Sequence, residues 1–283
     1  MTRTDGVHLA SDSASIPARW TPHLQSLARI IFGFLVLRHG MEQVFGFPEA
    51  SSAPRMSFEG ILELMALPGG LLIMLGLFTR QVCLVLAAMY FILYLVGPLQ
   101  EGIFPHRNGG DPILLNAFFF LYLAASGGGA WSLDRLRNPQ RDLSSDARFA
   151  PYALGILRVA AGCLFLMHGL EKFFGVGGGR IDRDITTIRG FAGLLESVGG
   201  PLIIVGLLTR PTAFILSGEM AVAYFRSWAP RGFWQSFAQP GMEASILFCY
   251  VFLFLWAAGP GAWSLDGLWR RTRRPVRHAA VDA

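Results

Sequence analysis

The strongest constraint on the fold of this chain is a series of short motifs that occurs twice, in the same order. The series contains His-Gly-x-Glu at residues 39–42 and again at 168–171. A Gly-Gly pair and a Gly-Leu-x-Thr-Arg turn follow in each half, and Ala-Trp-Ser-Leu-Asp closes the series at 130–134 and 262–266. Repetition on this scale indicates one module duplicated in tandem, so the two halves should share one fold.

Each module is apolar enough for a lipid bilayer. The chain is 53% hydrophobic and only 15% charged, with a mean hydropathy of +0.45, which is unusual for a water-soluble domain. Each half has four apolar stretches that can supply spans of about 20 residues. The stretches lie near 24–45, 58–78, 82–98, 112–127, 153–174, 188–208, 212–229 and 243–258. We therefore expect an all-α integral membrane protein of eight transmembrane helices, arranged as two parallel four-helix bundles related by internal duplication.

The positions of the charged residues predict the boundaries and the orientation. The expected segments are a flexible cytoplasmic tail at 1–20, a first module at 21–134, a cytoplasmic linker at 135–151, a second module at 152–269 and a basic cytoplasmic tail at 270–283. Arginines are most numerous near the helix ends on the side of the termini, which places both termini in the cytoplasm. The net charge of +5 resides in short loops and a tail, so anionic lipid headgroups fit better than nucleic acid as a partner.

Small residues recur every seven positions in the first helix of each half. They are Ser26, Gly33 and Gly40 in the first half and Gly155, Gly162 and Gly169 in the second. Seven residues are nearly two helical turns, so each set forms a stripe along which another helix can approach closely. We expect the first two helices of each half to pack through these glycines.

Two other motifs do not support the chemistry they suggest. The three cysteines, Cys83, Cys163 and Cys249, stand singly in apolar stretches, which argues against electron relay by a dithiol pair. The triple glycine at 177–179 lacks the Lys-Ser/Thr and the preceding strand of a phosphate-binding loop. We expect it to be a flexible loop.

Ionisable residues within the apolar stretches need an explanation, because a charge at mid-bilayer costs about 2.5–3.5 kcal/mol on insertion scales. The second half has five of them: His168, Glu171, Glu196, Glu219 and Arg226. Glu219 is the deepest and lies about two turns before Arg226, so its partners should come from other helices, Glu196 and His168 being the first candidates. In the first half, the places of Glu219 and Arg226 are taken by apolar residues. The second half is therefore the richer candidate site.

Three interpretations of these groups remain open. They could tie helices together by buried hydrogen bonds, or line a polar pocket for a small redox ligand or proton-carrying group. They could also bind a metal, because each His and the Glu three residues later lie on one side of a helix. Carboxylate metal sites in helical bundles use Glu-x-x-His with additional glutamates instead, so we predict no metal.

The motifs taken together resemble the DoxX family of small four-helix membrane proteins. The second half carries the whole pattern: Arg158, His168-Gly169 with Lys172, Glu196 with Gly199-Gly200, Thr209-Arg210, and Gly259 to Asp266. The first half departs from it, with Gln43 in place of the Lys and the Glu displaced to Glu63. The resemblance implies a protein of the bacterial plasma membrane in a redox setting, with quinone as a cofactor and a soluble or membrane redox subunit as a partner.

The leading functional hypothesis is a quinone-binding subunit of a membrane oxidoreductase or redox-stress complex. His168, Glu196 and Glu219 would be the catalytic groups that exchange protons, and the ligand would be held by a second set of groups. The second set comprises His39, Glu42, Glu171, Lys172 and Arg226. The alternative is a non-enzymatic membrane anchor or assembly factor, and a small-solute transporter is a third, less favoured interpretation.

Overall fold

A computed structural model describes residues 16–138, 148–232 and 240–272, and within these ranges the secondary structure is helical. The long helices are α1 (Ile16–Phe45), α2 (Phe58–Leu75), α3 (Thr79–Val96), α6 (Gly110–Ser126), α8 (Ala150–Phe174), α9 (Ile188–Val205), α10 (Thr209–Ser227) and α12 (Pro240–Ala258). The short ones are α4 (Pro98–Glu101), α5 (Pro105–Asn108), α7 (Leu133–Arg137), α13 (Leu265–Thr272) and the 3₁₀ turn η3 (Ala229–Arg231). Each predicted apolar stretch coincides with one long helix.

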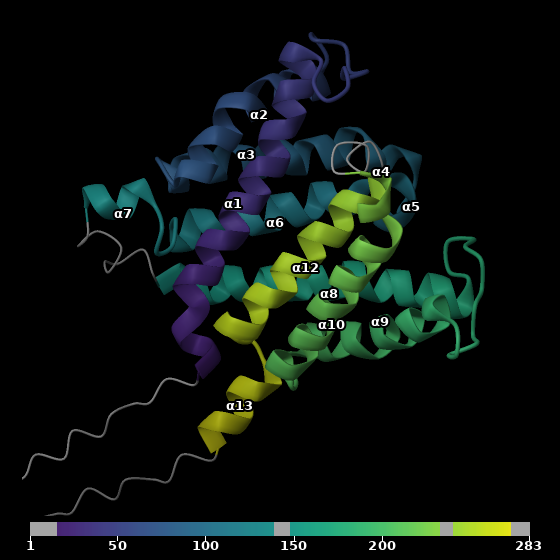
Figure 1. The fold of residues 1–283 in the computed structure, drawn as a ribbon. Helices are drawn as coiled ribbons and strands as arrows, with labels where there is room; N and C mark the ends of the chain where they lie inside the picture. Colours follow the sequence, from purple (N-terminus) through teal and green to yellow (C-terminus); the bar gives the residue numbers. More distant parts are fainter. Residues whose placement is uncertain (1–15, 139–147, 233–239, 273–283) are drawn as a thin grey trace, which may run out of the picture.

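The long helices form a central group of four and an outer group of four (Figure 1). The central helices α1, α6, α8 and α12 carry the contacts between the halves, with α1 against α12 and α6 against α8. The outer helices α2, α3, α9 and α10 pack on α1, α6, α8 and α12 respectively. The repeat predicted two self-contained bundles. The halves are instead packed together, because the first and last helices of each half pack on those of the other half.

Aromatic side chains fill the space between the central helices. The rings of Phe32 (α1) and Phe119 (α6) lie 4.0 Å apart between centroids, and Phe119 is 6.3 Å from Phe254 of α12. Phe165 of α8 is 4.9 Å from Phe252 of α12. These side chains are buried. The hydrophobic core therefore runs across both halves and fixes their relative position.

The expected close packing on α2 and α9 is confirmed for Gly33 and Gly40 of α1 and for Gly162 and Gly169 of α8, whereas Gly155 packs on Ala262 after α12. A Cβ atom on Gly40 would lie 2.3 Å from the backbone nitrogen of Leu67, and one on Gly169 would lie 2.5 Å from that of Ser197. No larger side chain fits at such distances without moving a helix. The glycines therefore set the spacing of each helix pair.

Two buried arginines explain another part of the repeat. Arg29 of α1 donates to the carbonyls of Met74 at 2.6 Å, Gly128 at 2.8 Å and Trp131 at 2.6 Å. Its counterpart Arg158 of α8 donates to the carbonyls that follow α12. Both side chains are fully buried. Each arginine thus supplies hydrogen bonds to a glycine-rich turn that has few partners of its own.

The aspartate of the closing motif caps a helix. Asp134 accepts hydrogen bonds from the backbone N–H groups of Phe78 and Thr79, where α3 begins, at 2.8 and 2.7 Å. Asp266 does the same for Leu208 and Thr209 at the start of α10, at 2.9 Å each. An anionic acceptor at a helix N-terminus is favourable for the helix dipole. The repeated Ala-Trp-Ser-Leu-Asp sequence therefore has a structural role, because its aspartate caps the next-to-last long helix of its half.

The outer helices turn apolar side chains away from the molecule. Examples on the four outer helices are Leu64, Leu84, Val198 and Phe214, all of them exposed. Five helices in the described parts of the chain are long and apolar enough to cross a membrane: Phe58–Leu75, Thr79–Glu101, Ala150–Phe174, Ile188–Val205 and Gly241–Ala258. Such a belt of exposed apolar side chains is suited to lipid rather than water.

The helix ends correct the predicted boundaries at three places. Helix α1 begins at Ile16, so residues 16–20 are helical rather than part of a tail, and the ring of His23 packs at 5.5 Å from that of Trp131 beside this first part of the helix. The predicted linker begins within α7, and the predicted basic tail begins within α13. The remaining parts of these segments, 1–15, 139–147 and 273–283, lie outside the described residues.

Candidate functional site

Two polar cavities lie at the end of the molecule opposite the starts of α1 and α8. The first has a volume of about 270 Å³ and is lined by side chains of α1, α2, α3, α6 and α12. The second, of about 210 Å³, lies among α5, α6, α8, α9, α10 and α12. Gly109 and Pro112 line both cavities. The start of α6 therefore forms a wall between them.

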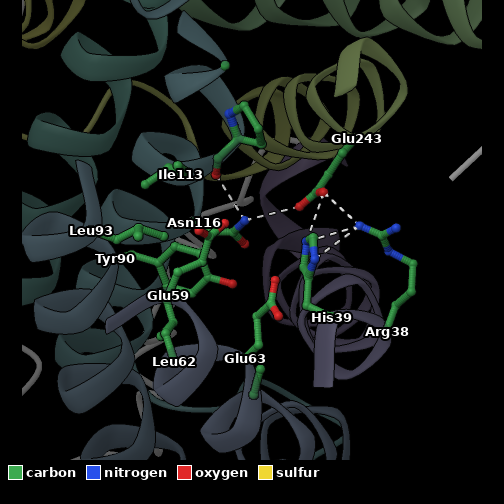
Figure 2. Close-up of a pocket in the computed structure, with 13 residues that line it drawn as sticks. Arg38, His39, Glu59, Leu62, Glu63, Tyr90, Leu93, Ile113, Asn116 and Glu243 are labelled. Atoms are coloured by element: carbon green, nitrogen blue, oxygen red, sulfur yellow. Dashed lines mark hydrogen bonds and ion pairs between the residues drawn. The ribbon is translucent and has the colours of Figure 1, made fainter. Parts of the chain in front are cut away.

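The first cavity contains a charged cluster centred on Glu243. Its carboxylate lies 3.1 Å from Nε2 of His39 and 3.3 Å from the Arg38 guanidinium, and Asn116 donates to it at 3.5 Å. Figure 2 shows Glu243 extending from α12 between Asn116 of α6 and His39 of α1. Arg38 also donates to Glu42 at 2.8 Å. The predicted pair of His39 and Glu42 is thus part of a larger network.

The second cavity contains two ion pairs. Nε2 of His168 lies 2.7 Å from a carboxylate oxygen of Asp111, and Lys172 is paired with Glu196. The other carboxylate oxygens of Asp111 and Glu196 are buried without a hydrogen-bond partner among the described residues. Each pair can therefore accept a further hydrogen bond from a group inside the cavity.

The acids that pair with the two histidines come from the opposite halves of the chain. Asp111 and Glu243 each precede by sixteen residues the first glycine of the turn before the closing motif, Gly127 and Gly259. Both lie in the first turn of their helices, where a negative charge is favourable. Sequence reasoning missed both acids, although their equal positions in the repeat were a visible signal. Of the two partners expected for Glu219, Glu196 does lie beside it, whereas His168 is paired with Asp111.

The first half also contributes more ionisable side chains to its cavity than expected. Its cavity is lined by Arg38, Glu59 and Glu63 besides the histidine. Glu63 accepts a hydrogen bond from Ser51 at 2.5 Å. The displaced glutamate is therefore not lost from the site, because Glu63 reaches the same cavity from one turn earlier in the helix.

The Glu171 side chain is directed toward α5 rather than into the second cavity. Its carboxylate is 3.8 Å from Nε2 of His106 and 3.5 Å from the Arg107 guanidinium, both on α5. Burial lowers the pKa of His106, and the neighbouring His168 lowers it further. His168 and Glu171, which are neighbours on one helix, thus contact different groups.

A third hollow, a groove of about 580 Å³, opens on the outer side of α9 and α10. Its walls are apolar, and its polar groups include Lys172, Arg189, Glu219 and Arg226. The carboxyl group of Glu219 lies beside that of Glu196, close enough for a hydrogen bond between them when one carboxyl group is protonated, and no other described residue bonds to its oxygens. Because Lys172 also lines the second cavity, it lies between that cavity and the groove.

The arrangement does not resemble a metal centre. Within the described ranges, no group of three or more His, Cys, Asp or Glu side chains is placed to hold a metal ion. The three cysteines are free, and Cys83 is buried apart from the cavities. The chemistry that the residues can support is proton exchange and stabilisation of negative charge.

A chain whose described residues form apolar helices, with apolar side chains outside and paired charges inside, is a multi-pass membrane protein. The sequence profile of the DoxX family matches residues 153–229, from α8 to the start of η3. An uncharacterized protein of Haemophilus influenzae is 36% identical over 126 residues, which are 42% of this chain and 92% of that protein. The chain belongs to the DoxX family.

A second relative supports the membrane assignment. An uncharacterized membrane protein of Mycobacterium tuberculosis is 34% identical over 133 residues, 41% of this chain and 80% of that protein. Each relative is thus matched over most of its own length by less than half of this chain. No solved structure matches the chain.

Proposed function

We propose that this protein binds a quinone-type ligand in the groove on α9 and α10 and serves as a subunit of a membrane oxidoreductase. The observation that carries the proposal is Glu219, which lines this groove and whose buried carboxylate oxygens have no neighbour to bond to among the described residues except the carboxyl group of Glu196. A carboxyl group left in this state is costly. A ligand that offers a hydrogen bond would remove that cost.

The groove fits an amphiphile that dissolves in lipid. Its volume of about 580 Å³ is within the usual range of about 300–1,000 Å³ for small-molecule sites. Phe191, Ile215 and Val222 line it and are exposed on the outside of the molecule. A ligand can therefore reach the polar groups sideways from the bilayer.

The polar groups of the groove suit the redox chemistry of such a ligand. A bound quinone supplies the exchange of two electrons and two protons. With a quinone bound, Glu219 would hold or release a proton, and Lys172 and Arg226 would be the cations that stabilise negative charge. His168 and Glu196 support this site from the second cavity, on the other side of Lys172.

The wider proposal places the protein in the bacterial plasma membrane with eight spans, both termini in the cytoplasm and anionic lipid headgroups around its basic segments. Duplication of one DoxX module is supported by the equivalent roles of Arg29 and Arg158 and of Asp134 and Asp266. It is also supported by relatives that match less than half of the chain. A separate redox subunit would supply or accept the electrons.

The proposal is tested by purifying the protein in mild detergent, extracting its lipids and identifying quinones by mass spectrometry. Binding of a short-chain quinone is then measured by thermal shift for the wild type, Glu219→Gln and the control Glu101→Gln, which changes an exposed acid outside the groove. We expect quinone with the wild type and the control, and affinity reduced at least about tenfold in Glu219→Gln. Absence of copurified quinone together with no stabilisation by added quinone contradicts the proposal.

A second candidate is a non-enzymatic anchor or assembly factor. It is favoured by the pairing of His39 with Glu243, His168 with Asp111, and Lys172 with Glu196, as expected if buried charges tie helices together. This candidate predicts that His168→Ala and Glu219→Gln lower function only in proportion to thermal stability. A quinone site predicts that Glu219→Gln loses function in a protein that remains stable.

A further inference from the structure

One imidazole in the second cavity has no hydrogen bond. The side chain of His106 is 0% exposed and lines the cavity. Both of its ring nitrogens are buried without a partner among the described residues. Leaving two such atoms unsatisfied costs stability, so the position of this ring calls for a role other than packing.

His106 lies between the cavity and the outside. Its ring centroid is 5.5 Å from that of His168, and its Nε2 atom is 3.8 Å from Glu171. The side chains of Glu171 and Arg107 are 17% and 44% exposed. His168, His106 and Glu171 therefore form a series that leads from the His168 and Asp111 pair to solvent-accessible groups.

The charge state of His106 allows the ring both to accept and to release a proton. Burial lowers the pKa of His106, and the nearby His168 and Arg107 lower it too. Glu171 and Asp111 raise this pKa, but the net shift is downward. A neutral imidazole can accept a proton at one nitrogen and release another from the second nitrogen. A ring already charged at neutral pH could not accept one.

The triple glycine lies over this series. A Cβ atom on Gly177 would be 3.2 Å from Nε2 of His106, and one on Gly179 would be 2.1 Å from a carboxylate oxygen of Glu171. A side chain at either position would therefore displace His106 or Glu171, and the φ of +82° at Gly177 also favours glycine there. This contact explains a motif that resembles a phosphate-binding loop without being one.

We propose that His106 relays protons between His168 and the water outside, through Glu171. This inference rests on the proposed function, because it says where the protons exchanged at the site go. The imidazolium of His168 gives a proton to neutral His106, whose other nitrogen releases one to the Glu171 carboxylate, which passes it to water. Each step breaks one N–H or O–H bond and forms another, and one water molecule can bridge the gap between the rings.

The test measures proton exchange in the protein without any quinone. Protein containing ¹⁵N-histidine is placed in lipid nanodiscs, the His168 signals are identified by their loss in His168→Gln, and their exchange rate with water is measured by NMR. We expect His106→Gln to slow this exchange at least about tenfold. The control His23→Gln, at the opposite end of α1 beside Trp131, should leave it unchanged. Equal rates in wild type and His106→Gln overturn the proposal.

A pair of loop variants provides an independent test that keeps the imidazole. Gly177 and Gly178 have φ values of +82° and +88°, so alanine is strained at both, but only Gly177 faces His106, and Gly178 has no neighbour within 4 Å. We expect slower exchange in Gly177→Ala than in Gly178→Ala. Identical rates in the two variants contradict the relay. Failure to bind quinone would instead contradict the proposed function and leave these rates unaffected.

Discussion

His168 and Asp111 are 57 residues apart in the sequence, yet the imidazole of one and the carboxylate of the other are separated by 2.7 Å. The two residues belong to different halves of the chain. The relationship is mirrored on the other side of the α6 wall by His39 and Glu243. Each of these two pairs therefore joins a histidine of one half to an acid of the other half.

The His168 and Asp111 pair should show a strong energetic coupling. In a double-mutant cycle of His168→Gln and Asp111→Asn, we expect an interaction energy of about 0.5–3 kcal/mol, because the two groups are in direct contact. The measurement is reversible unfolding in mixed micelles. His39→Gln combined with Asp111→Asn serves as the control and should be additive within about 0.5 kcal/mol. Additivity of the first cycle would show that the contact contributes nothing to stability.

Replacing Arg29 by lysine should be severe despite the retained charge. Lysine cannot reach several carbonyls with a planar fork, and each buried carbonyl left without a donor costs about 1–3 kcal/mol. We expect a loss of unfolding free energy of about 3 kcal/mol or more. Arg55→Lys changes an exposed arginine and should stay within about 0.5 kcal/mol of the wild type. Similar small effects of both variants would rule out a structural role for the carbonyl contacts.

Alanine should have opposite effects at two helical glycines. Gly40→Ala places a methyl group against the backbone of Leu67, and such overpacking costs about 1–3 kcal/mol. Gly218→Ala meets nothing within 4 Å and should be neutral or stabilise α10 by up to about 1 kcal/mol. Thermal unfolding of the two variants checks the difference. Equal melting temperatures would mean that α1 and α2 can move apart to accommodate the methyl group without loss of stability.

Acid should destabilise the protein partly through His106, which faces His168, Glu171, Asp111 and Arg107. The pKa of His106 is lower in the folded protein than its usual value of about 6.5. Protonation therefore favours the unfolded chain, so the contribution of the neutral ring is complete above pH of about 6.5 and is lost as the pH falls below it. We compare melting temperatures at pH 7.5 and 5.5, about one unit on either side of the usual histidine pKa. The decrease between these two pH values should be smaller in His106→Gln than in the wild type. An identical decrease would exclude this contribution.

Hydrophobic patterning predicted the long helices well but not their ends. Apolar spans were expected near 58–78 and 188–208, whereas α2 ends at Leu75 and α9 at Val205. The reason is local, because Gly76 and Gly206 adopt a left-handed conformation with φ of 67° that ends each helix. The repeated Gly-Leu-x-Thr-Arg motif marks this turn, which the hydropathy of the flanking leucines alone does not.

The candidate site could be predicted only in part. His168, Glu196 and Glu219 stand out because ionisable groups are rare in apolar helices. Asp111 and Glu243 were missed because an acid in the first turn of a helix is an ordinary feature of any helix N-terminus. Which helices of the two halves pack together depends on the shared aromatic core, and no periodicity within either half encodes that choice.

The exchange of acidic partners has an evolutionary consequence. A substitution of Asp111 or Glu243 in one half removes the partner of a histidine in the other half, so compensating changes should arise between the halves rather than within one of them. A relative that carries a single module would have to bring two identical subunits together to build the same cavities. We expect such proteins to be dimers, and cross-linking in native membranes would show whether they are.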